Sequence, residues 1–116
     1  MKSIVTKTRI AEDTSKRIAE LVTALKGWNL ISGLYSLDHR SPAEDIVHAL
    51  AVEAREIILI SIRLTCRWGE LALREDTAKL TRLELQLANL AEREKNIARQ
   101  CHKAFLAAAN GKEVEA

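Results

Sequence analysis

The stretch SPAEDIVHALAVEAREIILISIRLTCRW, residues 41–68, decides the fold of this chain. It opens on Ser41-Pro42-Ala43-Glu44, in which the Ser41 hydroxyl can accept a hydrogen bond from the backbone N–H of Glu44. The Glu44 carboxylate can in turn accept one from the N–H of Ser41, which makes a capping box. Proline suits the first position of a helix, because its missing N–H would have no partner there. The stretch therefore predicts a helix that begins at Pro42.

Apolar residues recur three or four positions apart along the rest of this helix, as on one helical face. The stripe consists of Val47, Leu50, Ala54, Ile57, Leu64, Trp68 and Leu71, with Ser61 between them. Isoleucines widen it on both flanks, Ile58 and Ile62 on one side and Ile46 and Ile60 on the other. The apolar sector therefore covers roughly 200° of the helix. Since a helix between two neighbours usually has a narrower face, the pattern indicates more apolar surface than a lone bundle needs.

Residues 60–66 also alternate between apolar and polar side chains, which is typical of a half-buried strand. A single strand in an otherwise helical chain would have nothing to pair with. The helical interpretation is therefore kept for the whole stretch.

The composition is that of one globular domain spanning residues 1–116. Hydrophobic residues make up 47% of the chain and charged residues 29%, so a core can form without disulfides or metal. The net charge of +2 is too small to indicate nucleic-acid binding by itself. One proline and four glycines leave few breaks, as expected for long helices.

No targeting signal is apparent in the sequence. The chain has no run of about 18 apolar residues that would span a membrane. Met1-Lys2-Ser3-Ile4 leads into charged residues rather than into a signal peptide. The two cysteines indicate reduced thiols, so we expect a cytoplasmic protein.

The first helical pattern starts at Arg9, after residues 1–8 that show no clear face. Its apolar stripe consists of Ile10, Ala11, Ile18, Leu21, Val22 and Leu25. Gly27 leaves two alternatives open. Either it ends this helix, and Asn29 caps a short second one that runs to Leu37, or a single helix continues with a bend.

The last helix has the most regular heptad pattern in the chain. Its core positions are Leu80, Leu83, Leu87, Leu90, Glu94, Ile97, Cys101, Ala104 and Ala108. We expect it to end at Asn110-Gly111 and to be followed by a disordered tail at residues 112–116.

The helix before it ends either at Gly69 or near residues 74–77, with Asp76 or Thr77 as the next cap. The later end is favoured, because Leu71 keeps the phase of the apolar stripe. Short connections between long helices make neighbours antiparallel. The expected fold is therefore all-α, an antiparallel up-down bundle of three long helices, or four elements if the first breaks at Gly27.

Residues that could bind a metal ion are few and isolated. His48 and His102 lack the HxxxH or Glu-x-x-His partners of a dedicated metal site. Cys101 occupies a core heptad position and is best interpreted as a small buried hydrophobe. Cys66 belongs near the other end of the bundle, so the two cysteines are not expected to form a disulfide. We therefore predict no metal and no cofactor.

Catalytic motifs are not found either. The chain has no phosphate-binding loop, no nucleophile elbow and no carboxylate pair that converges from different elements. Glu94 falls in a heptad core position, where we expect it to specify register or to pair with Arg93 or Arg55. The sequence therefore predicts a protein that is not an enzyme.

Two strips of basic residues lie away from the apolar stripes, and such strips can follow a phosphate backbone. The first consists of Arg63, Arg67 and Arg74, and the second of Arg82, Arg93 and Lys103. Glu56 and Glu70 interrupt the first strip, and few aromatic side chains are available to stack on bases. Solvated helix faces are the simpler interpretation of both strips.

The excess of apolar residues gives the leading functional hypothesis. Ile58 and Ile62 form the wide flank of the second long helix, while Val52 and Leu59 fall on its polar side. A contiguous apolar patch of this kind predicts an interface. Alternatively, the segment after Gly27 covers the flank within the chain.

The sequence therefore favours a non-enzymatic interaction module. Its partner would be itself, as a homo-oligomer, or a helix of another protein. The first alternative is a basic helical protein that binds RNA or DNA through the arginine strips. The second is an engineered helical scaffold without a natural function.

Overall fold

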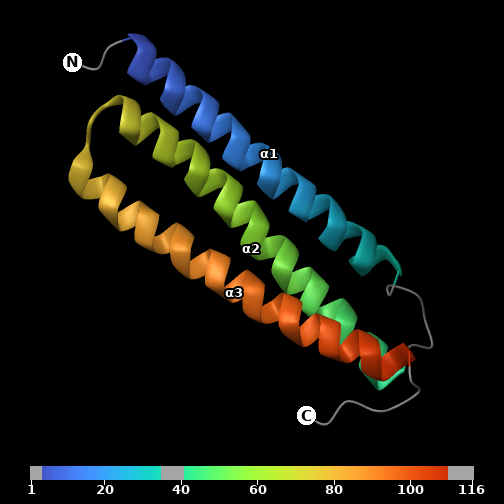
Figure 1. Ribbon diagram of the computed structural model, residues 1–116. Helices are drawn as coiled ribbons and strands as arrows, with labels where there is room; N and C mark the ends of the chain where they lie inside the picture. Colours follow the sequence, from blue (N-terminus) through green and yellow to red (C-terminus); the bar gives the residue numbers. More distant parts are fainter. Residues whose placement is uncertain (1–3, 35–40, 110–116) are drawn as a thin grey trace.

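The computed structural model describes residues 4–34 and 41–109, which form three long helices. Helix α1 spans Ile4–Leu34, α2 spans Pro42–Leu73 and α3 spans Thr77–Ala109. Helices that follow one another in the chain run antiparallel, in a rod of 60 × 22 × 19 Å (Figure 1). The prediction of an all-α antiparallel bundle of three long helices is confirmed.

The capping box at the start of α2 is present. The backbone N–H of Glu44 donates to the Ser41 hydroxyl at 3.2 Å. The N–H of Ser41 donates to the Glu44 carboxylate at 3.4 Å. Two donors at the helix start are thereby satisfied by local side chains, which fixes where α2 begins.

Helix α1 runs through Gly27 without a break, so the alternative of a helix end and a second capped segment is wrong. It also begins at Ile4, within the residues that showed no clear helical face. The alternation at residues 60–66 does not produce a strand, because this stretch is helical too. The expected helix ends at Leu37 and at Asn110-Gly111 and the expected tail at residues 112–116 lie outside the described residues.

Helix α2 ends at Leu73, close to the later of its two expected ends. Glu75 follows the end with φ of 60°. Its N–H donates to the Ala72 carbonyl at 3.3 Å, and the N–H of Asp76 donates to the Leu71 carbonyl at 3.2 Å. This pattern is a Schellman motif, which satisfies two carbonyls that the helix end leaves open.

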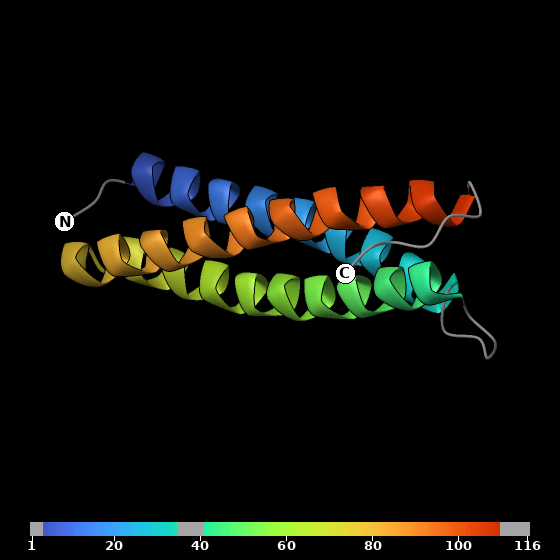
Figure 2. The same cartoon turned by 90° about the horizontal axis from the view of Figure 1, so that it is seen from below.

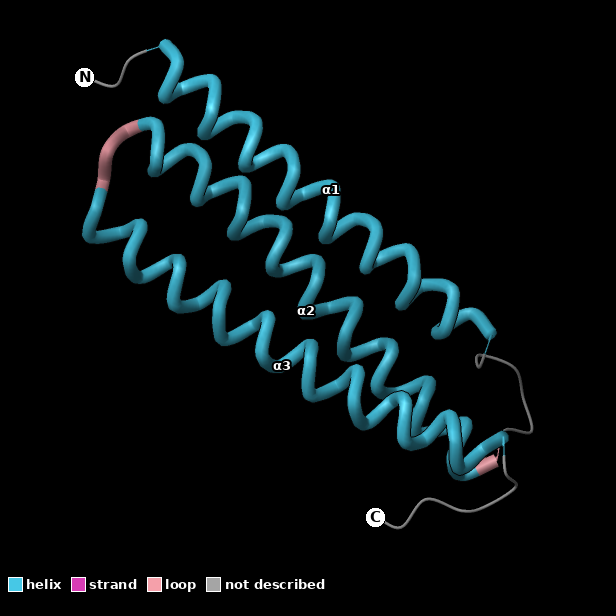
Figure 3. Tube along the Cα trace, in the orientation of Figure 1, coloured by secondary structure: helices cyan, strands magenta, loops and turns pink. Residues whose placement is uncertain are grey.

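Asp76 caps the next helix in the same turn. Its carboxylate accepts a hydrogen bond from the backbone N–H of Lys79 at 3.3 Å. The turn between α2 and α3 is therefore short, as Figure 3 shows, and it sends α3 back along α2.

Helix α2 occupies the centre of the bundle. It packs against α1 on one side and against α3 on the other, whereas no Cα atom of α1 lies within 8 Å of a Cα atom of α3. Over the middle of the molecule α1 and α3 both lie on the same side of α2 (Figure 2). The cross-section is therefore a V, with α2 at the apex and an open edge between α1 and α3.

The core fills the inside of this V. Its buried residues are Trp28, Val47, Ala51, Ala54, Ile57, Ile58, Leu90, Ile97, Cys101 and Ala104. Small residues such as Ala51 and Ala54 let neighbouring helices approach α2 closely. Gly69 does the same at the other end, because a Cβ atom there would lie 2.8 Å from Oγ1 of Thr14 on α1. Gly69 lies within α2, so the expectation that this helix ends at Gly69 is wrong.

Candidate interaction surfaces

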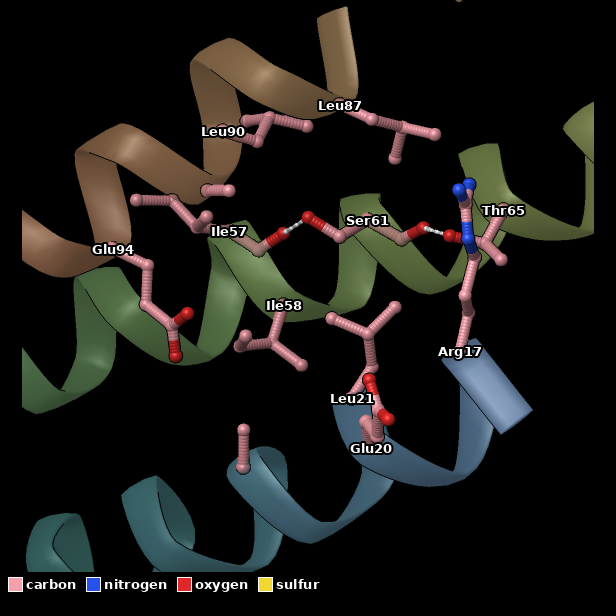
Figure 4. A pocket seen from close by; sticks show the side chains of 12 residues that line it. Arg17, Glu20, Leu21, Ile57, Ile58, Ser61, Thr65, Leu87, Leu90 and Glu94 are labelled. Atoms are coloured by element: carbon pink, nitrogen blue, oxygen red, sulfur yellow. Dashed lines mark hydrogen bonds between the residues drawn. The ribbon is translucent and has the colours of Figure 1, made fainter. Parts of the chain in front are cut away.

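The open edge of the V forms a groove of about 330 Å³ that is lined by all three helices. Leu21 and Ala24 line it from α1, and Leu87 and Leu90 line it from α3. Ile57 and Ile58 of α2 lie between these walls, as Figure 4 shows for the labelled side chains. The groove is therefore an apolar trough, with Glu20 and Glu94 among its lining residues.

Two tryptophans make hydrogen bonds between the helices that form the groove. The indole N–H of Trp28 on α1 donates to Oε2 of Glu94 on α3 at 3.1 Å. The indole N–H of Trp68 on α2 donates to Oε1 of Glu84 on α3 at 3.1 Å. The Arg17 guanidinium of α1 lies 4.6 Å from the centroid of the Trp68 ring, within the range of a cation–π contact.

Glu94 therefore bonds to a tryptophan. It makes no ion pair with Arg93 or Arg55, so the expectation that it pairs with one of these arginines is wrong. Arg93 instead lies 3.8 Å from the Glu53 carboxylate of α2. Trp28 could reach Glu94 because the splay of α1 and α3 leaves room for an indole between them.

The hydroxyls that line the groove are already used. Ser61 donates to the carbonyl of Ile57 at 2.8 Å, and Thr65 donates to the carbonyl of Ser61 at 2.7 Å. Neither hydroxyl is hydrogen-bonded to a side chain that could act as a general base. The groove therefore offers apolar contact, the carboxylates of Glu20 and Glu94 and the guanidinium of Arg17.

The second surface is the outer face of α2, on the side away from the groove. We define it by its exposed residues Val52, Glu53, Glu56, Leu59, Ile60, Arg63 and Arg67. Val52 is 37% exposed, and Leu59 and Ile60 are each 42% exposed. Because α2 is the apex of the V, neither neighbouring helix covers this face (Figure 2).

The four residues expected at an interface are divided between the two sides of α2. Val52 and Leu59 lie on the outer face. Ile58 is only 1% exposed and shares the groove lining with Leu21 and Ala24 of α1. Ile62 is half-buried against the core. One part of the wide apolar sector of α2 therefore packs within the chain, and the other part is solvent-exposed.

The segment of α1 after Gly27 covers little of the flank that Ile58 and Ile62 form on α2. Leu30 is 67% exposed and Leu34 is 61% exposed, whereas Ile31 packs half-buried against the core. The α1 residues that line the groove with Ile58, among them Leu21 and Ala24, come from the part of α1 before Gly27.

The charged residues of the outer face differ in whether they are paired. Arg67 lies 3.1 Å from the Glu70 carboxylate, and Glu53 lies 3.8 Å from Arg93. Glu56 and Arg63 are both exposed, and neither makes an ion pair with another described residue. These two opposite charges flank the apolar pair Leu59 and Ile60 along the helix.

The six basic residues of the two strips are all exposed. Arg63, Arg67 and Arg74 follow α2, while Arg82, Arg93 and Lys103 follow α3. The carboxylates that pair with Arg67 and Arg93 reduce the positive potential that either strip could present to a phosphate backbone.

The histidines and cysteines are dispersed. Nδ1 of His48 lies 3.2 Å from the Ser32 carbonyl of α1, as expected for an N–H donor, while His102 is exposed on α3. Cys101 is buried and Cys66 is exposed, and both are free thiols. Burial raises the pKa of the Cys101 thiol. Among the described residues no three metal-binding side chains come together.

Comparisons with known proteins give no relative from which a function could be transferred. No family model, no curated protein and no solved structure matches the chain. Within the described part of the chain, none of the three helices has a stretch sufficiently long and apolar to pass through a bilayer. The class defined by the fold is therefore an all-α three-helix protein with an open groove and a partly apolar outer face.

Proposed function

We propose that this protein is a non-enzymatic helical interaction module that self-associates through the outer face of α2. The observation that carries the proposal is the exposure of Val52, Leu59 and Ile60 on a helix whose other side is fully used in the core. Single exposed leucines are common on protein surfaces, whereas several neighbouring apolar residues on one helix mark an interface.

The apolar contribution of such an interface is substantial. Burying a leucine or isoleucine side chain completely is worth about 1.5–3 kcal/mol. Leu59 and Ile60 already bury part of their surface within the chain, so each adds less than that. In a symmetric assembly every such contact is made twice, which doubles the contribution of each residue.

Leu59→Asp tests the proposal directly. In the monomer the new carboxylate would be solvated, whereas in the assembly it would be desolvated without a partner at a cost of several kcal/mol. We expect wild-type protein to sediment as an oligomer at micromolar concentration and the variant to sediment as a folded monomer. Analytical ultracentrifugation over a range of concentrations measures both.

Leu85→Asp is the matched control, because Leu85 is 63% exposed on α3 and does not belong to the outer face. It introduces the same charge and should leave the sedimentation coefficient unchanged. A wild-type chain that stays monomeric at all concentrations would contradict the proposal.

The nucleic-acid alternative rests on the two arginine strips, and no contact in the structure favours it over self-association. Its test is separate, because replacing Arg63, Arg67 and Arg74 by Gln should weaken binding to RNA or DNA and flatten the salt dependence. We keep self-association as the proposed function.

A further inference from the structure

The charges on the outer face of α2 are arranged by sign about Leu59 and Ile60. Glu53 and Glu56 precede this apolar pair, and Arg63 and Arg67 follow it. Within α2 the one acidic residue after Ile60 is Glu70, which pairs with Arg67. The Nε atom of Arg55, a basic residue of the first half, is buried, so Arg55 does not belong to the outer face.

We propose that the partner of this face is a second copy of the same chain, with its α2 antiparallel and a two-fold axis between Leu59 and Ile60. This arrangement rests on the proposed function and specifies its geometry. A two-fold axis at this point places Glu56 opposite Arg63 of the second copy, and Arg63 opposite the Glu56 of that copy. Glu56 and Arg63, neither of which makes an ion pair with another described residue, then each gain one.

The remaining positions of the face agree with the same axis. Glu53 comes within one residue of the height of Arg67 of the second copy, and Val52 comes within one residue of the height of its exposed Cys66. Leu59 and Ile60 lie on either side of the axis, so each is at the height of the other residue of the second copy and within one residue of its own counterpart. Charges therefore meet opposite charges and apolar residues meet apolar residues along the whole contact.

A parallel arrangement of the two α2 helices would bring like charges together. It would place Glu56 against Glu56 and Arg63 against Arg63, and like charges directly opposite one another are destabilising. The V-shaped cross-section permits the antiparallel contact, because α1 and α3 both lie on the other side of α2 over the middle of the molecule (Figure 2). Two α2 helices can therefore approach to the usual interaxial distance of about 8–10 Å.

Charge reversal tests the orientation. Glu56→Arg alone would oppose arginines at both symmetric contacts, and Arg63→Glu alone would oppose glutamates, so each should weaken self-association by about tenfold or more. The double variant with both substitutions restores opposite charges across the antiparallel axis and should return to within about threefold of the wild-type dissociation constant. These differences should shrink in high salt, because the contacts are exposed at their edges.

Disulfide trapping tests the register, in a Cys66→Ser background that removes the exposed thiol. Ile60→Cys places two thiols beside the axis, so oxidation should yield a covalent dimer. Val52→Cys is the matched control, because the two copies of residue 52 would lie roughly 22 Å apart along the helices. That separation is far beyond the Cα distance of about 4.4–6.8 Å that a disulfide spans.

The outcomes separate the two proposals. A monomeric wild type contradicts both the self-association and its geometry. If the wild type associates and Leu59→Asp abolishes the association, but the single charge reversals have no effect, the outer face is the interface and the antiparallel geometry is wrong. Equal trapping at positions 52 and 60 would indicate a parallel arrangement and would also overturn the geometry.

Discussion

Nε1 of Trp28 donates a hydrogen bond to Oε2 of Glu94 across 3.1 Å, between two helices whose backbones do not contact each other. Trp28 is 9% exposed, so this indole is held inside the open edge of the V. The bond links α1 to α3 and limits how far these two helices can separate. A charged acceptor makes such a bond stronger than one between neutral groups.

Trp28→Phe removes the donor and leaves the Glu94 carboxylate without its partner. Hydrogen bonds to charged groups contribute about 1.5–3 kcal/mol, so we expect a loss of that order in the free energy of unfolding, measured by urea denaturation. Glu94→Gln keeps an acceptor oxygen and should cost less. Trp68→Phe serves as a comparison, because its bond to Glu84 is exposed and its loss should be smaller still. Equal losses in Trp28→Phe and Trp68→Phe would contradict this role for the groove-spanning bond.

Gly27 and Gly69 should respond in opposite ways to the same substitution. A Cβ atom at Gly27 meets nothing within 4 Å, so Gly27→Ala should stabilise the protein by up to about 1 kcal/mol through helix propensity. A Cβ atom at Gly69 would lie 2.8 Å from Oγ1 of Thr14, whose hydroxyl is held by the Ile10 carbonyl at 2.7 Å. Gly69→Ala should therefore lower the melting temperature. A rise at both positions would show that α1 gives way easily at Thr14.

Glu75 occupies a backbone conformation that suits glycine. Its φ of 60° brings the Cβ atom close to the following carbonyl oxygen. Glu75→Gly relieves that strain, although glycine also gains entropy in the unfolded chain. The left-handed conformation costs an L-residue about 1–2 kcal/mol, which exceeds the entropy term of about 0.4–1 kcal/mol, so we expect a net stabilisation in thermal or urea unfolding. Glu75→Ala retains the Cβ atom and is the control that should show no gain.

The helical elements could be predicted in large part because their signals are local. The Ser41 capping box, the stripe of α2 and the heptads of α3 depend on neighbours within a few residues, and the structure contains all three helices. Because these signals are local, the sequence leaves open whether Gly27 ends the first helix. A helical glycine costs only about 1 kcal/mol, which the packing of α1 against α2 overrides.

The surfaces could not be predicted, because they depend on how the helices splay. The sequence places Leu59 on the polar side of α2, where it is exposed, but it does not reveal that its neighbour Ile58 lies in the groove within the chain. The bond between Trp28 and Glu94 joins residues 66 positions apart. Glu94 in a heptad core position indicates a partner, but the arginines expected for that role, Arg93 and Arg55, are not the residues that the fold brings to it.

Cys101 should make the protein less stable at alkaline pH. Burial raises the pKa of its thiol above the usual value of 9.0, so the folded state favours the protonated form and the unfolded state ionises first. The stabilisation is therefore fully present below about pH 9 and is lost as the pH rises through the folded-state pKa. Urea unfolding at pH values of about 8 and 10 should show a larger fall in stability for the wild type than for Cys101→Ala.

A thiol reagent should label Cys66 in the folded protein and Cys101 only on unfolding, since Cys101 is 3% exposed. Rapid labelling of both thiols under native conditions would show that α3 separates from α2 at this point.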